Sequence, residues 1–252
     1  NGINGVGGLE RVLAIKTNWL IEQCDYQIQI VTLNNGHSDP FYEFNSKIEY
    51  YDISISGYPM SKIFTYILEI RKALKRLQPD VISVCDDGLK GILFPFLISN
   101  KIPVVYERHV SRRIEQKNDV SSICEKIALG IKYFLMSIGS RRFDRFVVLT
   151  RGGVEEWKYA NLEVIPNPLP FYPNSVSNLN SKKVIAIGKQ GYQKGYDRLL
   201  KIWKVVNKKH PDWTLEIVGT LNREAGLTEL SRELDLSDSV IFSPPTKDIQ
   251  LK

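Results

Sequence analysis

The sequence predicts an α/β protein with two parallel-sheet domains, and three observations support this prediction. Short apolar runs alternate with amphipathic helical patterns, which is the order of right-handed βαβ units. Prolines at positions 166, 168, 170 and 173 and the polar segment 174–183 then interrupt the alternation, as a linker does. Beyond them the alternation restarts with an apolar run, a glycine-rich loop and a helix. We therefore expect a domain over residues 1–168, a linker over 169–183 and a second domain over 184–252.

The elements of the first domain follow from local patterns. A glycine-rich turn over residues 1–8 precedes a helix whose apolar stripe contains Leu9, Val12, Leu13, Ile15, Trp19 and Leu20. Strand signals lie at residues 26–33, 48–55, 81–85, 102–106, 145–149 and 162–165. Helical patterns lie at residues 60–77, 89–99, 121–140 and 154–159. The strand at 102–106 is expected to deliver Glu107, Arg108 and His109 to its carboxyl end.

The second domain shows the same alternation in a shorter form. Strands are expected at residues 184–187, 214–218 and 240–242, and helices at 197–209 and 224–234. The run Val184–Ile187 is continuously apolar, which is typical of a strand buried on both faces. Since three strands make a thin sheet and the chain does not begin with Met, we expect a piece of a longer protein with an incomplete second domain.

The loop after Val184–Ile187 is the strongest candidate for a binding site. It begins at Gly188, carries Lys189 and Lys194, and ends at Gly195 before an amphipathic helix. A strand, a glycine-rich loop and a helix N-terminus bring backbone N–H groups to an anion, and two lysines add positive charge. We therefore expect the loop to hold the phosphates of a nucleotide; the alternative is a surface turn with solvated lysines. The spacing does not fit a Walker loop.

The overall charge suits an anionic partner. The formal net charge is +6 and the isoelectric point is near 9.1. Because the basic residues are scattered, a nucleic-acid footprint is not predicted. No signal peptide and no membrane span is visible in the sequence. The glycines of residues 2–8 do not have the G-x-G-x-x-G spacing of a dinucleotide site.

Cysteine and histidine spacing argues against a metal site. Cys24, Cys85 and Cys124 show no C-x-x-C spacing and cannot all pair, so reduced thiols in the cytosol are expected. The three histidines are scattered, and two of them, His37 and His210, are expected to be ordinary loop residues.

The helix predicted at residues 121–140 allows two interpretations. Basic residues Lys126, Lys132, Arg141 and Arg142 accompany a set of apolar residues, namely Ile123, Ile127, Leu129, Ile131, Phe134, Leu135 and Ile138. A basic amphipathic helix can lie on an anionic membrane. We prefer the interpretation that this helix packs on the core and exposes its charged face.

Six segments, in this order, resemble the retaining glycosyltransferases of family 4, which have the GT-B fold of two facing Rossmann-like domains. They are GVGGLERV (5–12), VVYERHVS (104–111), VVLTRGGVEEW (147–157), VIPNPL (164–169), IGKQGYQKGYDRLL (187–200) and HPDWTLEIVG (210–219). The resemblance implies transfer of a sugar from a nucleotide-diphosphate sugar, with retention of configuration, to a glycan, lipid or other acceptor. It also implies a role in polysaccharide biosynthesis, in the cytoplasm or at the inner face of the membrane.

The resemblance assigns roles to residues of this chain. Gly188, Lys189, Lys194 and Gly195 would bind the donor diphosphate without a metal or another cofactor, and Gly7 and Gly8 would face that site from the first domain. His109 would contact the donor sugar or the acceptor near the reacting carbon. Glu107 and Arg11 are candidates for the sugar or acceptor side, although Glu107 is also placed to pair with Arg108. Asp86 and Asp87 are expected to form a solvated turn.

The chain departs from the family pattern in two ways. Lys189 stands where the family usually has Arg, and the family's two glutamates, seven residues apart, would lie beyond Lys252. We therefore expect the 252-residue chain to be a poor catalyst by itself. The alternative functions are nucleotide binding without catalysis and sugar-nucleotide epimerisation by the same fold.

Overall fold

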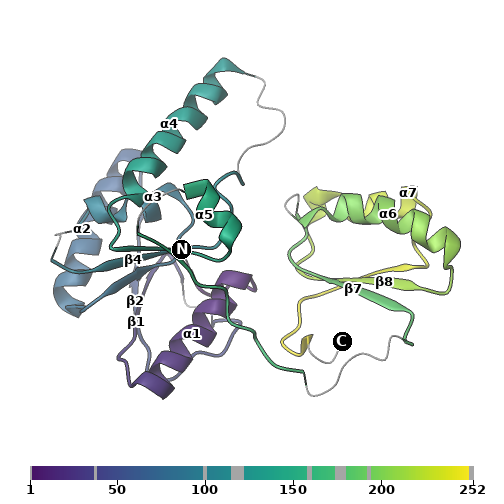
Figure 1. Ribbon diagram of the computed structural model, residues 1–252, viewed down its shortest axis with the longest axis horizontal. Coiled ribbons are helices and arrows are strands. Elements are labelled where there is room, and N and C mark those ends of the chain that lie inside the picture. The colour runs from purple at the N-terminus through teal and green to yellow at the C-terminus, as the bar shows by residue number, and fades with distance from the viewer. Residues whose placement is uncertain are drawn as a thin grey trace. The chain divides into compact units, whose positions relative to one another are not determined.

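The structure is a computed structural model that describes residues 2–36, 39–98, 101–114, 122–157, 161–173, 180–191 and 194–249. His37 and part of the predicted linker, residues 174–179, lie outside this range. The chain divides into two compact units (Figure 1). Unit 1 consists of Asn1–Gly5 and Val12–Pro168, and unit 2 consists of Val6–Arg11 and Leu169–Lys252.

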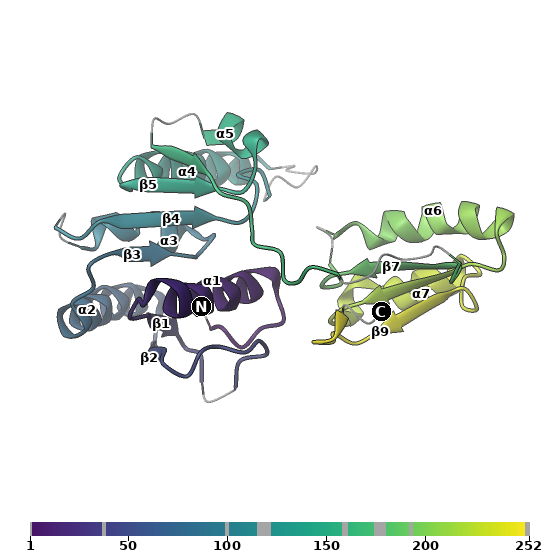
Figure 2. The ribbon, with the colours of Figure 1, turned by 60° about the horizontal axis from the view of Figure 1, so that its bottom comes forward.

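The described strands of unit 1 form two parallel sheets. The smaller sheet pairs β1 (Gln29–Leu33) with β2 (Glu49–Ile53). The larger has the order β3-β4-β5-β6, formed by β3 (Ile82–Val84), β4 (Val104–Arg108), β5 (Arg145–Val148) and β6 (Leu162–Val164). The arrows of β3, β4 and β5 run the same way in Figure 2. The residues after β3 and β4 therefore meet at one edge of the sheet.

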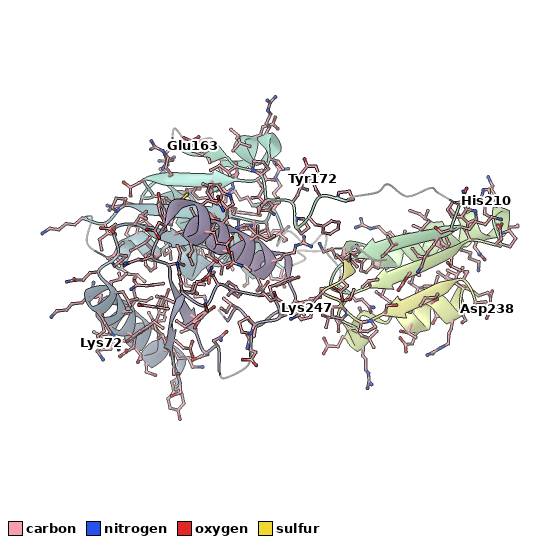
Figure 3. The ribbon with its side chains drawn as sticks, turned by 90° about the horizontal axis from the view of Figure 1, so that it is seen from below. Lys72, Glu163, Tyr172, His210, Asp238 and Lys247 are labelled. Carbon is pink, nitrogen blue, oxygen red and sulfur yellow. The ribbon has the colours of Figure 1, made fainter. Side chains whose placement is uncertain are left out.

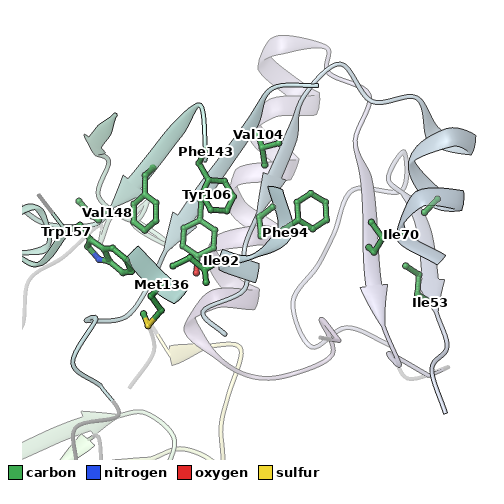
Figure 4. Close-up of a cluster of buried hydrophobic side chains, with 13 residues drawn as sticks. Ile53, Ile70, Ile92, Phe94, Val104, Tyr106, Met136, Phe143, Val148 and Trp157 are labelled. Carbon is green, nitrogen blue, oxygen red and sulfur yellow. The ribbon is translucent and has the colours of Figure 1, made fainter. Parts of the chain in front are cut away.

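The helices of unit 1 pack around these sheets. They are α1 (Gly8–Cys24, which belongs to unit 1 from Val12 on), α2 (Pro59–Leu77), α3 (Leu89–Ile92), the 3-10 turn η1 (Phe94–Phe96), α4 (Ile123–Ser140) and α5 (Arg151–Trp157). The core between sheet and helices contains a run of aromatic rings, Tyr106, Phe146 and Trp157, whose centroids lie 4.9 and 4.7 Å apart (Figure 4). All three side chains are buried.

Several predicted boundaries of unit 1 are wrong for local reasons. The helix expected over 89–99 ends at Ile92, and Pro95 lies in a separate 3-10 turn, since proline cannot donate the next helical hydrogen bond. The predicted stripe of the first helix is only partly buried: Val12 faces the core but the Trp19 side chain is 57% exposed. Strand β4 runs to Arg108, so Glu107 and Arg108 are strand residues and project to opposite faces.

The interpretation that helix α4 packs on the core through its apolar stripe is wrong. Only Met136, Gly139 and Ser140, at its carboxyl end, are fully buried. Five large apolar side chains on one face are exposed: Ile123 (75%), Ile127 (58%), Ile131 (55%), Phe134 (64%) and Ile138 (40%). Figure 1 shows the first half of α4 extending beyond the rest of unit 1. The periodicity located the stripe correctly, but periodicity does not say what covers it.

The described residues of unit 2 form a three-stranded parallel sheet with two helices on one face (Figure 1). Its strands are β7 (Lys183–Ile187), β8 (Thr214–Val218) and β9 (Val240–Ser243), in that order. The helices are α6 (Tyr196–Lys209) and α7 (Leu227–Glu233), with the 3-10 turn η3 (Arg223–Ala225) before α7. Leu200 and Trp203 of α6 pack on Leu215 and Ile217 of β8 in a second core.

Two predictions for unit 2 are corrected by the structure. The strand at 184–187 is not buried on both faces, because among the described residues β7 pairs only with β8 and is an edge strand. Its side chains at Val184, Ile185 and Ile187 are 36%, 37% and 55% exposed. The helix expected over 224–234 is divided at Gly226, whose φ of 59° lies in the left-handed region.

Candidate functional site

Strand β4 positions the first group of candidate residues. Alternation along the strand buries Tyr106 and Arg108 on one face and directs Glu107 to the other. His109 follows directly, and its backbone N–H donates to Asp87 Oδ1 at 3.0 Å. Because Asp87 follows the neighbouring strand β3, this bond holds the ends of β3 and β4 together.

On the Glu107 face, five side chains from three elements gather. Glu107 Oε1 accepts hydrogen bonds from Lys16 of α1 and, at 2.6 Å, from Ser83 Oγ of β3. Lys16 Nζ also lies 3.7 Å from Cys85 Sγ. His109 Nε2 is 3.7 Å from Glu107 Oε2, an ion-pair distance beyond hydrogen-bond range, and has no hydrogen-bond partner among the described residues. We call Lys16, Ser83, Cys85, Glu107 and His109 the β4 cluster.

The charges of the β4 cluster shift the proton affinities of its members. Burial alone would lower the pKa of His109, but Cys85 and the Glu107 carboxylate outweigh it and raise this pKa to about 9. Burial would raise the pKa of Glu107, but His109, the Lys16 ammonium and the Ser83 hydroxyl lower it to about 2. The pKa of Lys16 is raised, because Cys85 and Glu107 together overcome its desolvation. At neutral pH, therefore, His109 is an imidazolium beside a carboxylate.

Two interpretations of neighbouring residues are wrong. Glu107 does not pair with Arg108, since the two side chains project to opposite faces of β4. Asp86 and Asp87 are not a solvated turn: Asp86 accepts from the Gly88 N–H at 2.7 Å and pairs with Lys90, while Asp87 holds the His109 backbone. Both aspartates therefore shape the end of the sheet.

Arg108 is a buried cation on the opposite face. Its side chain is 3% exposed, donates to the backbone carbonyls of Asp87, Val110 and Ser111, and lies over the Trp157 ring. Next to it is a shallow pocket whose basic lining residues are Arg108, Arg112 and Lys132, with Lys132 supplied by α4. Burial and the nearby Arg108 lower the pKa of Lys132. Asp87, 3.7 Å from the Arg108 guanidinium, also lines this pocket, so three basic side chains and one carboxylate surround it.

The second group of candidates is the loop between β7 and α6 in unit 2. Gly188 has φ 152° and Gly195 has φ 64°, both conformations that L side chains rarely adopt. The Gly188 N–H donates to Val218 O at 2.9 Å, and the methylene stem of Lys194 lies against Gly188. Gly195 caps α6. The loop therefore begins and ends at glycines in conformations that favour glycine, and its binding of phosphates stays a prediction.

The two lysines of this loop are exposed and uncommitted. Within the described residues, neither Lys189 nor Lys194 forms an ion pair. Gln190 lies between Lys189 and Gly191 and is buried. Its side-chain amide has no hydrogen-bond partner in the part of the chain that the structure describes. No pattern in the sequence indicates this buried amide.

Gly219, which lies outside the loop, leaves room for the Gly188 carbonyl at the start of the loop. A side chain at Gly219, just after β8, would lie well inside van der Waals distance of the Gly188 carbonyl oxygen. Gly219 and Gly188 thus form a contact between neighbouring strand ends that only glycine permits. The predicted piece HPDWTLEIVG ends on this residue.

The other predicted residues lie in simpler surroundings. Gly7 precedes α1 and its carbonyl accepts from the Arg11 N–H at 3.3 Å, whereas Gly8 is the first residue of α1. His210 follows α6 and is exposed (Figure 3). Cys85, Glu107 and His109 each bring one donor atom to within 4.8 Å of the others, an arrangement that their spacing in the sequence does not indicate. Among the described residues, no helix is long and apolar enough to cross a membrane.

Comparison with protein families identifies both parts of the chain. The profile "Glycosyl transferase 4-like" matches residues 11–147, and "Glycosyl transferases group 1" matches residues 172–252.

Individual proteins agree with the profiles. An uncharacterized glycosyltransferase of Haemophilus influenzae is 30% identical over 98% of this chain and 68% of its own length. The amylovoran biosynthesis glycosyltransferase AmsD of Erwinia amylovora is 27% identical over 99% of this chain and 68% of its own length. The crystal structure of Anabaena HepE with UDP and glucose superposes with a TM-score of 0.68 at 15% identity, covering 100% of this chain and 70% of that one. The fold is thus the GT-B fold of two Rossmann-like domains.

Proposed function

The chain belongs to the group 1 glycosyltransferases and is an enzyme of that type, and from this premise we propose that it transfers a sugar from a nucleoside-diphosphate sugar with retention of configuration. The observation that carries the proposal is the loop of unit 2, where two uncommitted lysines stand between glycines at the N-terminus of α6. A uridine diphosphate donor is the first to test, because HepE was solved with UDP and glucose.

The proposed chemistry needs positive charge where the leaving group forms. Breaking the bond to the anomeric carbon leaves negative charge on the diphosphate. Lys189, Lys194 and the N-terminal N–H groups of α6 would stabilise that charge in advance, so that no metal is required. Since the lysines are point charges on flexible stems, the backbone between Gly188 and Gly195 has to supply the directional hydrogen bonds.

His109 is proposed to contact the donor sugar near the reacting carbon. Its imidazolium, held beside Glu107, is a hydrogen-bond donor at neutral pH. Glu107 lies beside the ring, and Lys16 in turn holds the Glu107 carboxylate in place. We assign His109 the contact with substrate and Glu107 the positioning of His109.

The double variant Lys189→Ala/Lys194→Ala is expected to abolish stabilisation by UDP. A ligand at about 100 times its Kd raises the unfolding free energy by about 2.7 kcal/mol, which a thermal shift detects readily. Removing both charges is expected to weaken UDP binding by roughly a hundredfold, at about 1.4 kcal/mol for each charge-assisted contact. Titration calorimetry and thermal shift with UDP, GDP and the corresponding sugars make the measurement.

The matched control is Lys208→Ala/Lys209→Ala, which removes the same charge from the other end of α6, where both lysines are exposed. This control should bind UDP as the parent does. Equal binding by the Lys189/Lys194 variant and the parent would contradict the diphosphate site.

We also infer that the acceptor is presented at a membrane surface and that α4 is the contact. The exposed stripe of α4 is apolar along the whole helix, and Lys126, Arg141 and Arg142 accompany it with a single acidic residue, Glu125. Burial of such a stripe at an anionic bilayer combines apolar transfer with attraction to lipid headgroups. Other residues of α4 line the cationic pocket beside Arg108, a suitable place for an anionic group of a lipid-linked acceptor. The free thiols fit the cytoplasmic leaflet.

The variant Ile127→Ser/Phe134→Ser is expected to reduce binding to anionic vesicles by about a hundredfold or more, because each side chain would lose about 1.5–3 kcal/mol of apolar transfer when fully buried. Co-sedimentation with phosphatidylglycerol/phosphatidylethanolamine vesicles makes the measurement, and added salt should also weaken binding. Ile202→Ser/Val205→Ser on α6, where both side chains are about 60% exposed, is the matched control. If vesicle binding is unchanged in the α4 variant, or light scattering shows that α4 instead joins two copies, the membrane assignment is wrong.

A further inference from the structure

The β4 cluster brings together three side chains that can ligate a metal, and one of them, Cys85, has no role in the proposed sugar transfer. The Cys85 thiol, the Glu107 carboxylate and the His109 imidazole come from two adjacent strand ends and converge, with one donor atom from each within 4.8 Å of the others. His109 is 8% exposed and Glu107 is 14% exposed, so the donors are largely removed from water. The buried His109 Nε2 has no hydrogen-bond partner among the described residues. Its nearest charged group is Glu107 Oε2 at 3.7 Å, so no direct hydrogen bond holds this nitrogen, and it can bind a metal once it loses its proton.

The chemistry of the three donors is selective. Thiolate, imidazole and carboxylate are the ligands of zinc sites, and three protein ligands with one open position is the usual set for zinc that binds a further molecule. Donors on a tetrahedral zinc lie roughly 3.3–3.8 Å apart, so closure by about 1 Å brings this set to coordination distance. Magnesium and calcium prefer oxygen ligands only, so they do not fit a set that contains a thiol and an imidazole.

A cation already lies among these donors. The Lys16 ammonium contacts both Cys85 and Glu107, so the space between these two donors accepts a positive charge. Lys16 is attached through a long flexible stem and its side chain is 27% exposed, so it can leave toward solvent. A divalent ion and Lys16 would therefore exclude each other.

We propose that Cys85, Glu107 and His109 form a binding site for Zn²⁺ or a similar thiophilic divalent cation, which enters in place of Lys16. Binding forms bonds to the Cys85 sulfur, an oxygen of Glu107 and a nitrogen of His109, and the thiol and imidazolium protons pass to water. The metal is inhibitory, because it occupies the ring that contacts the donor sugar. This last consequence rests on the proposed function, whereas the binding itself does not.

The test measures metal binding directly on the 252-residue chain. Zn²⁺ is titrated in competition with a chromogenic chelator, and Co²⁺ is added as a spectroscopic probe. The parent should bind one equivalent, with a thiolate-to-cobalt charge-transfer band in the near ultraviolet. Cys85→Ser should remove that band and weaken Zn²⁺ binding by about tenfold or more, since it removes the softest ligand. Cys124→Ser, at an exposed cysteine, should leave both unchanged.

Lys16→Met should change the affinity for Zn²⁺ in the direction opposite to Cys85→Ser. Removing the competing ammonium should tighten Zn²⁺ binding by roughly tenfold, whereas a merely structural role of Lys16 predicts weaker binding or none. This arm remains decisive even if Cys85→Ser fails to fold. A parent without the charge-transfer band, or unchanged affinity in both Cys85→Ser and Lys16→Met, would overturn the metal site. UDP binding measured beside it tests the proposed function separately.

Discussion

Gly219→Ala is expected to unfold or severely loosen unit 2 and to abolish nucleotide binding. Its new methyl group would overlap the Gly188 carbonyl oxygen, which is backbone and cannot rotate away. Relief requires β7 and β8 to separate where the Gly188 N–H donates to Val218 and the Gln190 N–H donates to Thr220. Overpacking of this kind costs about 1–3 kcal/mol, and each broken buried hydrogen bond adds about 1 kcal/mol.

Thermal unfolding and UDP titration of this variant make the measurement, with Gly191→Ala as the control for stability. Gly191 lies in the same loop, but a side chain there would meet nothing within 4 Å. The control should keep the parent's unfolding temperature. A Gly219→Ala variant that is as stable as the parent and binds UDP equally well would show that the contact between Gly219 and Gly188 does not set the loop.

Glu107→Gln is expected to have the second large effect, on the charge state of His109. Without the carboxylate, the pKa of His109 should fall, because burial then opposes the charged ring with only Cys85 to compensate. The protein has three histidines, so the ring signals are few and an NMR titration can follow His109, assigned by its loss in His109→Gln. Transfer activity that depends on the imidazolium should fall in parallel.

The difference in stability between the parent and Glu107→Gln should depend on pH. The pKa of His109 is raised from 6.5 to about 9, so its contribution is complete below pH 6.5 and is lost as the pH rises through 9. The pKa of Glu107 is lowered from 4.5 to about 2, so its contribution is complete above pH 4.5 and is lost as the pH falls through 2. The free energy of unfolding of the parent should therefore exceed that of Glu107→Gln most between pH 4.5 and 6.5, by on the order of 2–3 kcal/mol.

Glu163→Gln is the matched control for this pH profile. Glu163 has a 57% exposed side chain and lies 3.7 Å from Arg145, so its removal should change stability little at any pH. Hydrogen exchange of the β4 amides reports on unit 1 alone. An equal pH profile for the parent and Glu107→Gln would show that Glu107 and His109 are not coupled.

The sequence predicted the order of strands and helices because apolar period and glycine or proline interruptions are local signals. It also predicted the loop with Lys189 and Lys194, where charge and glycine lie within eight residues. It could not predict the β4 cluster as a whole. Lys16, Cys85 and Glu107 are far apart in the chain, and only the parallel pairing of β3 with β4 and the packing of α1 bring them together.

The failures have the same origin. Whether an apolar stripe is covered depends on neighbours that its own periodicity does not encode, and this explains both α4 and β7. Asp87 was predicted as a solvated residue because two adjacent aspartates after a strand are usually exposed. Its position at the carboxyl end of β3, beside the end of β4, was the signal that would have linked it to His109.

Helix α4 is packed against the rest of unit 1 only at its carboxyl end, so its two ends differ in local stability. At its last turns, Gly139 lies so close to the Ile92 carbonyl that a side chain would not fit, so this end is locked to α3. Its first turns, residues 123–128, are exposed on every side and rely on the capping box between Ser122 and Glu125. Local unfolding of α4 therefore begins at the N-terminal end and stops where Gly139 packs against the Ile92 carbonyl. A bilayer that receives the apolar stripe would supply the tertiary support that the first turns lack, and it would convert a fraying segment into an ordered one.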